Sequence, residues 1–253
     1  MHWDTLLSKE VFHYFIVFVR FAAAFTSFPF YGSYFVPRRL RLIFAIVTAV
    51  AVTPVLSPLL PEMPSNIPET FRLIVIEITI GLFLGLSGFF MLSAVDLAGT
   101  VAAQASGFAN ATAFDQTSQV QSTVLTTFLT LTALLLVIVT GVYQTMLSAA
   151  VGSYKVFVPG QAVIFGDMAK SLIETLSAAF VYGFKIASPF VIMMIILYSA
   201  MGVMSRLMPQ LNILFVMMPF QVYAGMSLLM VCLSMMMMWF LRYFEQQIAR
   251  FAM

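Results

Sequence analysis

The sequence is poor in charged residues. Only 9% of its 253 residues are Asp, Glu, Lys or Arg, whereas a soluble domain carries about 25%. Two long stretches, 116–154 and 207–241, contain none of these four residue types. This composition excludes an ordinary soluble domain. The net charge is only +2 and the basic residues are scattered, so the chain has no electrostatic footprint for nucleic acid.

Cysteine and histidine are almost absent as well. Cys232 is the only cysteine, so no disulfide can form within the chain, and we interpret it as a small buried hydrophobic residue. The two histidines, His2 and His13, both lie near the N-terminus. No group of His, Cys, Asp or Glu has the spacing of a metal site. The sequence therefore predicts a protein without a cofactor and without catalytic activity.

Hydrophobic residues, by contrast, make up 62% of the chain. They gather in six segments of about the length that spans a bilayer. The last three exceed what a hydrocarbon core of about 30 Å requires, so they must tilt, break or extend beyond the membrane. We predict an all-α integral membrane protein of about six long, partly broken helices. The segments are 11–30, 42–60, 73–95, 124–151, 172–201 and 211–241.

Between the second and third segments, four prolines lie within positions 58–68. Prolines at such spacing exclude a helix there. Lys and Arg are divided between both sides of a six-span arrangement, so the usual excess of basic residues in cytoplasmic loops does not orient the chain. This even division argues against a simple serpentine of six spans.

The stretch 99–123 is rich in small, amide and hydroxyl residues, and Asp115 is its only charge. It is too polar for a lipid-facing helix and too uncharged for a typical solvated loop. Non-helical backbone at membrane depth must be buried in protein or line a watery cavity. Two interpretations are open: a mobile loop inside a conduit, and an ordinary loop between helices.

Ionisable residues also occur in or at the end of apolar segments, namely Arg20, Glu77, Asp96 and Lys185. Such groups are costly in lipid and normally pair with one another or face an interior. Arg20 and Glu77 have opposite charges at comparable depth in their segments, so they are candidates for an ion pair. A structural or intersubunit pair and a proton relay are both open as roles.

A stretch rich in proline and amides follows Arg206. Each proline removes a backbone donor and leaves a carbonyl of the preceding turn without a partner, and nearby amide side chains can replace that partner. The prolines are Pro209 and Pro219, and the amides are Gln210, Asn212 and Gln221. The pattern indicates a defined bend, or otherwise a plain turn between helices. We expect Arg206 to meet a carboxylate or carbonyl cluster on a partner subunit, or Glu77 or Asp96.

Taken together, these residues resemble the FliR family of export-gate proteins, called SctT in virulence-type secretion systems. The resemblance covers most of the chain. Its most specific part is Arg-Leu-Met-Pro-Gln-Leu-Asn at 206–212, followed by Pro219 and Gly225. Further matching positions are Arg20, Pro29, Gly32, Pro37, Arg41, Glu77, Gly81, Gly85, Asp96, Gly99, Gln104, Gly107, Phe108, Phe114, Asp115, Gly141, Pro159 and Gly160.

The resemblance implies a noncatalytic subunit of the flagellar type III protein export gate, in the bacterial inner membrane at the flagellar basal body. FliP-like and FliQ-like subunits would complete a helical assembly that conducts unfolded flagellar proteins, and an FlhB-like protein would wrap its cytoplasmic entrance. Such an assembly is lifted largely out of the bilayer plane, toward the periplasm. Residues 1–253 are expected to form a single membrane domain in contact with lipid.

The resemblance also implies a loop that plugs the pore, at 104–121. The predicted plug residues are Gln104, Ser106, Gly107, Phe108, Asn110, Phe114, Asp115, Gln116 and Gln119. The predicted intersubunit or buried polar residues are Arg20, Glu77, Asp96, Lys185, Arg206, Pro209, Gln210, Asn212, Pro219 and Gln221.

A secondary transporter with broken helices and a polar site at the midplane is the alternative function. Inverted symmetry within the chain would favour the transporter, whereas co-purification with FliP-like and FliQ-like proteins would favour the gate. An intramembrane protease fits less well, because no histidine occurs on a later helix.

Overall fold

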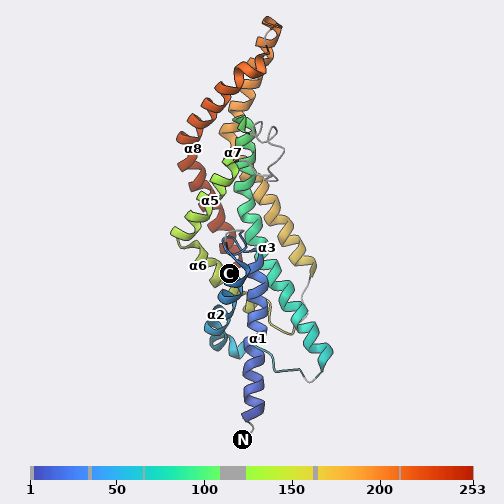
Figure 1. The fold of residues 1–253 in the computed structure, drawn as a ribbon. Helices are drawn as coiled ribbons and strands as arrows, with labels where there is room; N and C mark the ends of the chain where they lie inside the picture. The colour runs from blue at the N-terminus through green and yellow to red at the C-terminus, as the bar shows by residue number, and fades with distance from the viewer. Residues whose placement is uncertain are drawn as a thin grey trace. The chain divides into compact units, whose positions relative to one another are not determined.

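The structure is a computed structural model that describes residues 3–33, 36–64, 66–108, 124–161, 165–210 and 212–252. Within these ranges the chain forms helices joined by short connections and contains no β-strand (Figure 1). The predicted all-α class is therefore confirmed. The elements are α1 (Trp3–Ser27), α2 (Arg38–Leu56), the 3-10 turn η1 (Ser57–Leu59), α3 (Ile67–Ala105), α5 (Val124–Val139), α6 (Val142–Val156), α7 (Phe165–Leu207) and α8 (Ile213–Ala252).

Five of the described helices are long and apolar enough to cross a membrane, namely α1, α2, α3, α7 and α8. The broken pair α5 and α6 adds a sixth candidate if it is counted as one span. With 39, 43 and 40 residues, α3, α7 and α8 are each about 60 Å long, roughly twice the thickness of the hydrocarbon core. These helices must reach beyond the core or cross it at a steep tilt.

The fourth predicted segment, 124–151, differs from the expectation of one continuous helix. It is divided between α5 and α6 at Gly141, which has a φ of 76°. Glycine adopts this left-handed conformation without the steric penalty of a side chain. The proline-rich connector also needs a correction. Pro58 lies in η1 and Pro68 in the first turn of α3, where a missing N–H leaves no helical bond unmade.

The chain forms two compact units, which are described separately. Unit 1 consists of Met1–Met91, Gly141–Leu176 and Gln246–Met253, and unit 2 of Leu92–Thr140 and Ser177–Glu245. The long helices α3, α7 and α8 contribute to both units. That all of 1–253 behaves as a single domain stays a prediction.

In unit 1, α1 lies against α2 and runs parallel to α3 at very close range. Two glycines of α3 permit this approach. A Cβ on Gly81 would collide with the backbone carbonyl of Arg20, and a Cβ on Gly85 would lie 2.6 Å from the Ala24 carbonyl oxygen. Small residues four positions apart on one helix face let two backbones pack closely in a membrane.

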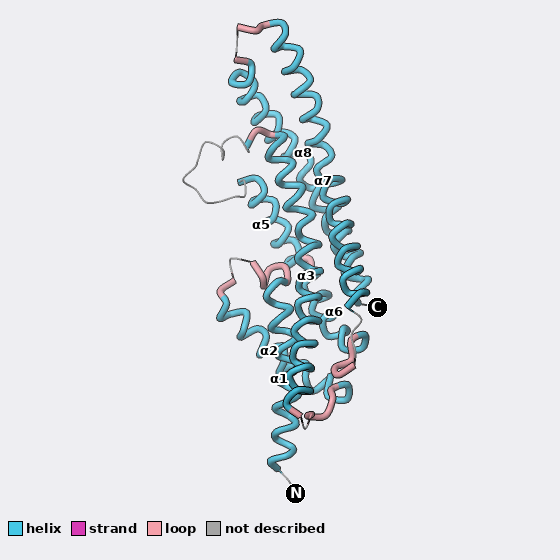
Figure 2. Tube along the Cα trace, turned by 90° about the vertical axis from the view of Figure 1, so that its right-hand side faces the viewer, coloured by secondary structure: helices cyan, strands magenta, loops and turns pink. Residues whose placement is uncertain are grey.

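In unit 2, α7 and α8 form an antiparallel hairpin, seen side by side in Figure 2. The Tyr182 and Tyr243 rings stack with centroids 4.4 Å apart, and the Gln221 amide nitrogen lies 3.7 Å from the Met201 sulfur. The C-terminal part of α3 packs against both α5 and α8. This packing places the end of α3 beside the start of α5.

Substitution of Gly81 by alanine is expected to destabilise the fold, because the new Cβ would collide with α1. Overpacking of this kind typically costs about 1–3 kcal/mol. Gly152→Ala is the matched control, since nothing lies within 4 Å of a Cβ at this helical position. It should be neutral or stabilising, because glycine within a helix costs about 0.5–1 kcal/mol relative to alanine. Thermal unfolding of the purified chain in detergent compares the two, and equal melting temperatures would contradict the close packing.

Candidate functional site

A buried ion pair joins α1 to α3 in unit 1. Arg20 is 1% exposed and Glu77 is 0% exposed. Nε of Arg20 donates to Oε2 of Glu77 at 2.5 Å, and Nη2 donates to Oε1 at 2.9 Å. The flat guanidinium thus meets the carboxylate through two parallel hydrogen bonds, the geometry in which arginine pairs most strongly. The pairing expected from the opposite charges is confirmed.

Further donors of Arg20 reach the C-terminal end of α6. Nη1 donates to Oγ of Ser153 and Nη2 to the carbonyl oxygen of Phe157, both at 3.1 Å. The guanidinium carbon lies 3.7 Å from the centroid of the Tyr154 ring, within the range of a cation–π contact. We call Arg20, Glu77, Ser153, Tyr154 and Phe157 the Arg20 cluster. It holds three helices together around one charge.

The geometry of the Arg20 cluster favours a structural role over a proton relay. A guanidinium keeps its proton in proteins, so Arg20 cannot pass one on. Glu77 already accepts two hydrogen bonds from Arg20. The α6 partners could not be predicted, because Ser153 lies 133 positions from Arg20 and carries no charge that would distinguish it.

Asp96 makes a second polar contact, in unit 2. It lies inside α3, not at the end of a helix as the hydrophobic segment 73–95 suggested. Its Oδ1 accepts a hydrogen bond from the Thr130 hydroxyl of α5 at 2.5 Å. One turn farther along, Gly99 packs against Thr126, where an added Cβ would lie 2.8 Å from the Thr126 Cα. Neither contact could be predicted, because the apolar segment that forms α5 contains several threonines and nothing in the sequence distinguishes Thr126 and Thr130.

The described part of the predicted plug consists of the last residues of α3 and the residues 106–108 that follow it. Gln104 is exposed and Ser106 is buried, with the Ser106 hydroxyl donating to the Ala102 carbonyl at 2.7 Å. Gly107 has a φ of 73°, and a glycine in this conformation commonly ends a helix. Ser106 also packs on Gly225 of α8, where a Cβ would collide with it.

The chain enters and leaves the predicted plug at the same end of unit 2, because α3 and α5 are antiparallel neighbours at this point. Phe108 is half-buried and is the last described residue before the segment 109–123. The remaining predicted plug residues lie outside the described residues. They are Asn110, Phe114, Asp115, Gln116 and Gln119.

The proline- and amide-rich stretch is a turn between two helices. Pro209 and Gln210 lie in the turn that follows the end of α7 at Leu207, and Asn212 directly precedes α8. This corresponds to the plain turn considered as the alternative. A helix usually ends near the residue before a proline, because the α conformation is disfavoured there.

Helix α8 continues through Pro219 without a break. A bend of the helix at this proline stays a prediction. Gln221 is buried, but its amide donates to the Met201 sulfur at 3.7 Å. This contact differs from the expectation that Gln221 satisfies a carbonyl freed by Pro219.

Arg206 and Lys185 are both exposed. The two carboxylates considered as partners of Arg206 are engaged elsewhere, Glu77 by Arg20 and Asp96 by Thr130. A partner of Arg206 on another subunit stays a prediction. Lys185 is not buried by its own chain, and its ammonium lies 4.9 Å from the centroid of the Tyr182 ring.

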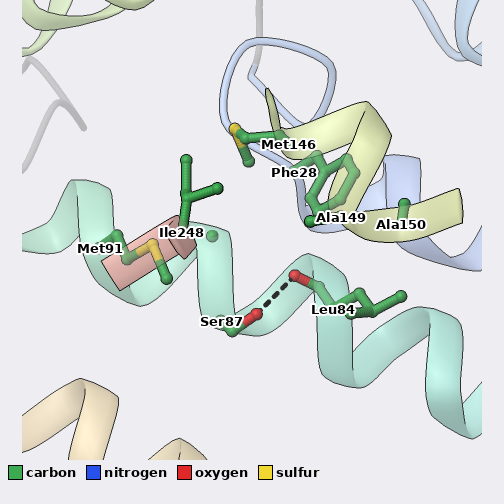
Figure 3. A pocket seen from close by; sticks show the side chains of 9 residues that line it. Phe28, Leu84, Ser87, Met91, Met146, Ala149, Ala150 and Ile248 are labelled. Carbon is green, nitrogen blue, oxygen red and sulfur yellow. Dashed lines mark hydrogen bonds between the residues drawn. The ribbon is translucent and has the colours of Figure 1, made fainter. Parts of the chain in front are cut away.

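A cavity of about 20 Å³ lies in unit 1 among Phe28, Met91, Met146 and Ile248 (Figure 3). The only polar side chain in its lining is Ser87, whose hydroxyl donates to the Leu84 carbonyl at 2.8 Å. A space of this size holds about one water molecule, so we interpret it as a packing defect. Among the residues that the structure describes, no three His, Cys, Asp or Glu side chains are placed to hold a metal ion.

Comparison with known proteins gives a match along nearly the whole chain. Residues 11–247 match the family described as bacterial export proteins, family 1. The flagellar biosynthetic protein FliR of Caulobacter vibrioides is 29% identical over 231 residues, which covers 91% of this chain and 92% of the relative. FliR of Bacillus subtilis is 30% identical over 224 residues, covering 87% and 85%, and FliR of Escherichia coli 27% over 221 residues, covering 85% and 82%.

Removal of either partner of the buried pair is expected to destabilise the fold by about 3–5 kcal/mol, because the other charge is left buried alone. The singles are Arg20→Met and Glu77→Leu. The double variant should be more stable than either single, since it leaves no unpaired charge. Arg72→Met, at an exposed position of α3, is the control and should change little. If thermal unfolding in detergent shows the double variant losing the sum of both singles, the pairing argument fails.

Proposed function

Because the chain belongs to the family of bacterial export proteins, family 1, and is related to flagellar FliR proteins, we propose that it is a noncatalytic subunit of the flagellar type III export gate. The chain is a flagellar export protein with several helices able to span a membrane. In the proposed gate it forms, with FliP-like and FliQ-like subunits, the channel for unfolded flagellar proteins across the inner membrane.

The helix surfaces support an assembly. In the apolar stretches long enough to cross a membrane, the chain buries only 22% of α2, 22% of α7 and 28% of α8. The exposed remainder is largely apolar and needs lipid or other subunits as neighbours. Helices about 60 Å long have more apolar length than one bilayer can cover. Neighbouring subunits that project toward the periplasm would cover the excess.

The base of the predicted plug is the observation that carries the proposal furthest. Helix α3 ends at Ala105, Gly107 follows with a positive φ, and α5 begins at Val124 at the same end of unit 2. The contact between Ser106 and Gly225 and the bond between Asp96 and Thr130 hold this base. A loop attached at two adjacent points can fill a conduit and move aside without disturbing the helices. We therefore retain 104–121 as the proposed plug of the channel.

The remaining parts of the proposal come from the resemblance. They are the FlhB-like protein at the cytoplasmic entrance, the place in the flagellar basal body, and the intersubunit role of Arg206. A secondary transporter finds less support. Such a protein needs a polar site open to a substrate, whereas the donors and acceptors of Arg20 and Glu77 are largely occupied by each other.

Deletion of residues 107–119 is expected to leave the complex assembled but to make the membrane permeable to small ions, because the pore then lacks its plug. Conductance of the purified complex in planar bilayers measures this directly. An intact deleted complex with unchanged conductance would contradict the sealing role.

Two point substitutions test the same seal without removing any residue. Gly225→Ala should displace Ser106 and produce a partial leak, because the new Cβ would collide with that residue. Adding Ser106→Gly removes the colliding side chain and should restore the seal. If Gly225→Ala leaks equally with and without Ser106→Gly, the base of the plug is not held by this contact.

A further inference from the structure

A groove of about 190 Å³ lies between α7 and α8 in unit 2. Its lining from α7 includes Lys185, Pro189 and Ile192, and its lining from α8 includes Cys232, Met235 and Trp239. Because the two helices are antiparallel, Lys185 faces the Trp239 end of the groove and Ile192 faces the Cys232 end. The groove is therefore cationic and aromatic at one end and apolar at the other.

The charge of Lys185 has no counter-charge in this groove. No carboxylate occurs in the lining. In the part of the chain that the structure describes, the ammonium contacts the Tyr182 ring and forms no ion pair. The side chain is exposed. An occupant with a negative group at the Lys185 end would complement this charge.

The position of the groove along the hairpin indicates its depth in a membrane. Ile186 to Ser205 of α7 contains no charged residue and is about 30 Å long at 1.5 Å per residue, the thickness of the hydrocarbon core. On α8 the charge-free stretch ends at Arg242, one turn beyond Trp239. Basic side chains together with Tyr and Trp are typical of the membrane–water interface. The apolar end of the groove then faces the membrane interior.

We propose that this groove binds one anionic phospholipid. The headgroup phosphate lies at Lys185, at the level of Tyr182 and Trp239. One acyl chain follows the groove past Pro189 and Met235 toward Ile192 and Cys232. The order of charge, aromatic ring and apolar wall along the groove matches the order of phosphate, glycerol and acyl chain in the lipid. Basic groups between membrane helices bind anionic headgroups in this way.

Cys232 offers a probe of occupancy, because it is the only cysteine of the chain and lines the apolar end of the groove. The purified chain is freed of lipid in a nonionic detergent. Phosphatidylglycerol or phosphatidylcholine is then added to the micelles, and the rate of Cys232 alkylation by N-ethylmaleimide is followed by intact mass. Phosphatidylglycerol is expected to slow the reaction about fivefold more than phosphatidylcholine, the effect of one basic residue near an anionic surface.

Three variants separate the charge from the fold. Lys185→Gln should abolish the difference between the two lipids, and Lys185→Arg should retain it. Lys170→Gln, at an exposed position of the same helix, is the control and should leave it unchanged. Equal protection by the two lipids, or selectivity that survives Lys185→Gln, would overturn the proposal.

A partner subunit is the competing occupant, and a second measurement excludes or establishes it. The same alkylation is performed on the chain co-purified with FliP-like and FliQ-like proteins and stripped of lipid. The lipid site predicts that Cys232 stays reactive until phosphatidylglycerol is added. Complete protection of Cys232 in the lipid-free complex would assign the groove to a protein contact and overturn the lipid site.

Discussion

Arg20 places a permanent positive charge inside an apolar helix, and the packing of unit 1 follows from how that charge is neutralised. Glu77 meets it with two hydrogen bonds, while Ser153 and Phe157 accept two more. These contacts require α1 and α3 to lie very close, which Gly81 permits. The same α3 continues into unit 2 and ends at the base of the proposed plug. One helix thus connects the buried charge to the segment proposed to close the channel.

The second constraint is the amount of apolar surface that the chain leaves uncovered. The exposed faces of α2, α7 and α8 cannot remain in water, so the chain requires lipid, other subunits or both. The proposed gate supplies subunits, and the groove at Lys185 is proposed to hold a lipid. Both proposals follow from the same observation, because the chain by itself covers too little of the apolar surface of its helices. In the proposed gate, assembly would therefore contribute to stability as well as to function.

The hydrophobic segments and the Arg20–Glu77 pair could be predicted, because apolar runs and isolated opposite charges are visible in the sequence. The break at Gly141 and the unbroken helix at Pro219 could not, since neighbouring helices and side chains in a membrane protein can satisfy the backbone groups that glycine or proline would leave free. The contact between Asp96 and Thr130 depends on the register between α3 and α5. Lys185 was expected to be buried or to lie between subunits. It is exposed on its own chain, which excludes burial within the chain and leaves a place between subunits a prediction.

As a proposed subunit of an export gate, this chain would be incomplete alone. The direct measurement is affinity purification of the tagged chain, expressed with its FliP-like and FliQ-like partners and separately without them, followed by the native mass of each preparation. We predict a defined complex that contains all three proteins, and a chain that is soluble in detergent but melts at a markedly lower temperature when it is expressed alone. A monodisperse, heat-resistant monomer that binds neither partner would contradict a role of this chain as a gate subunit.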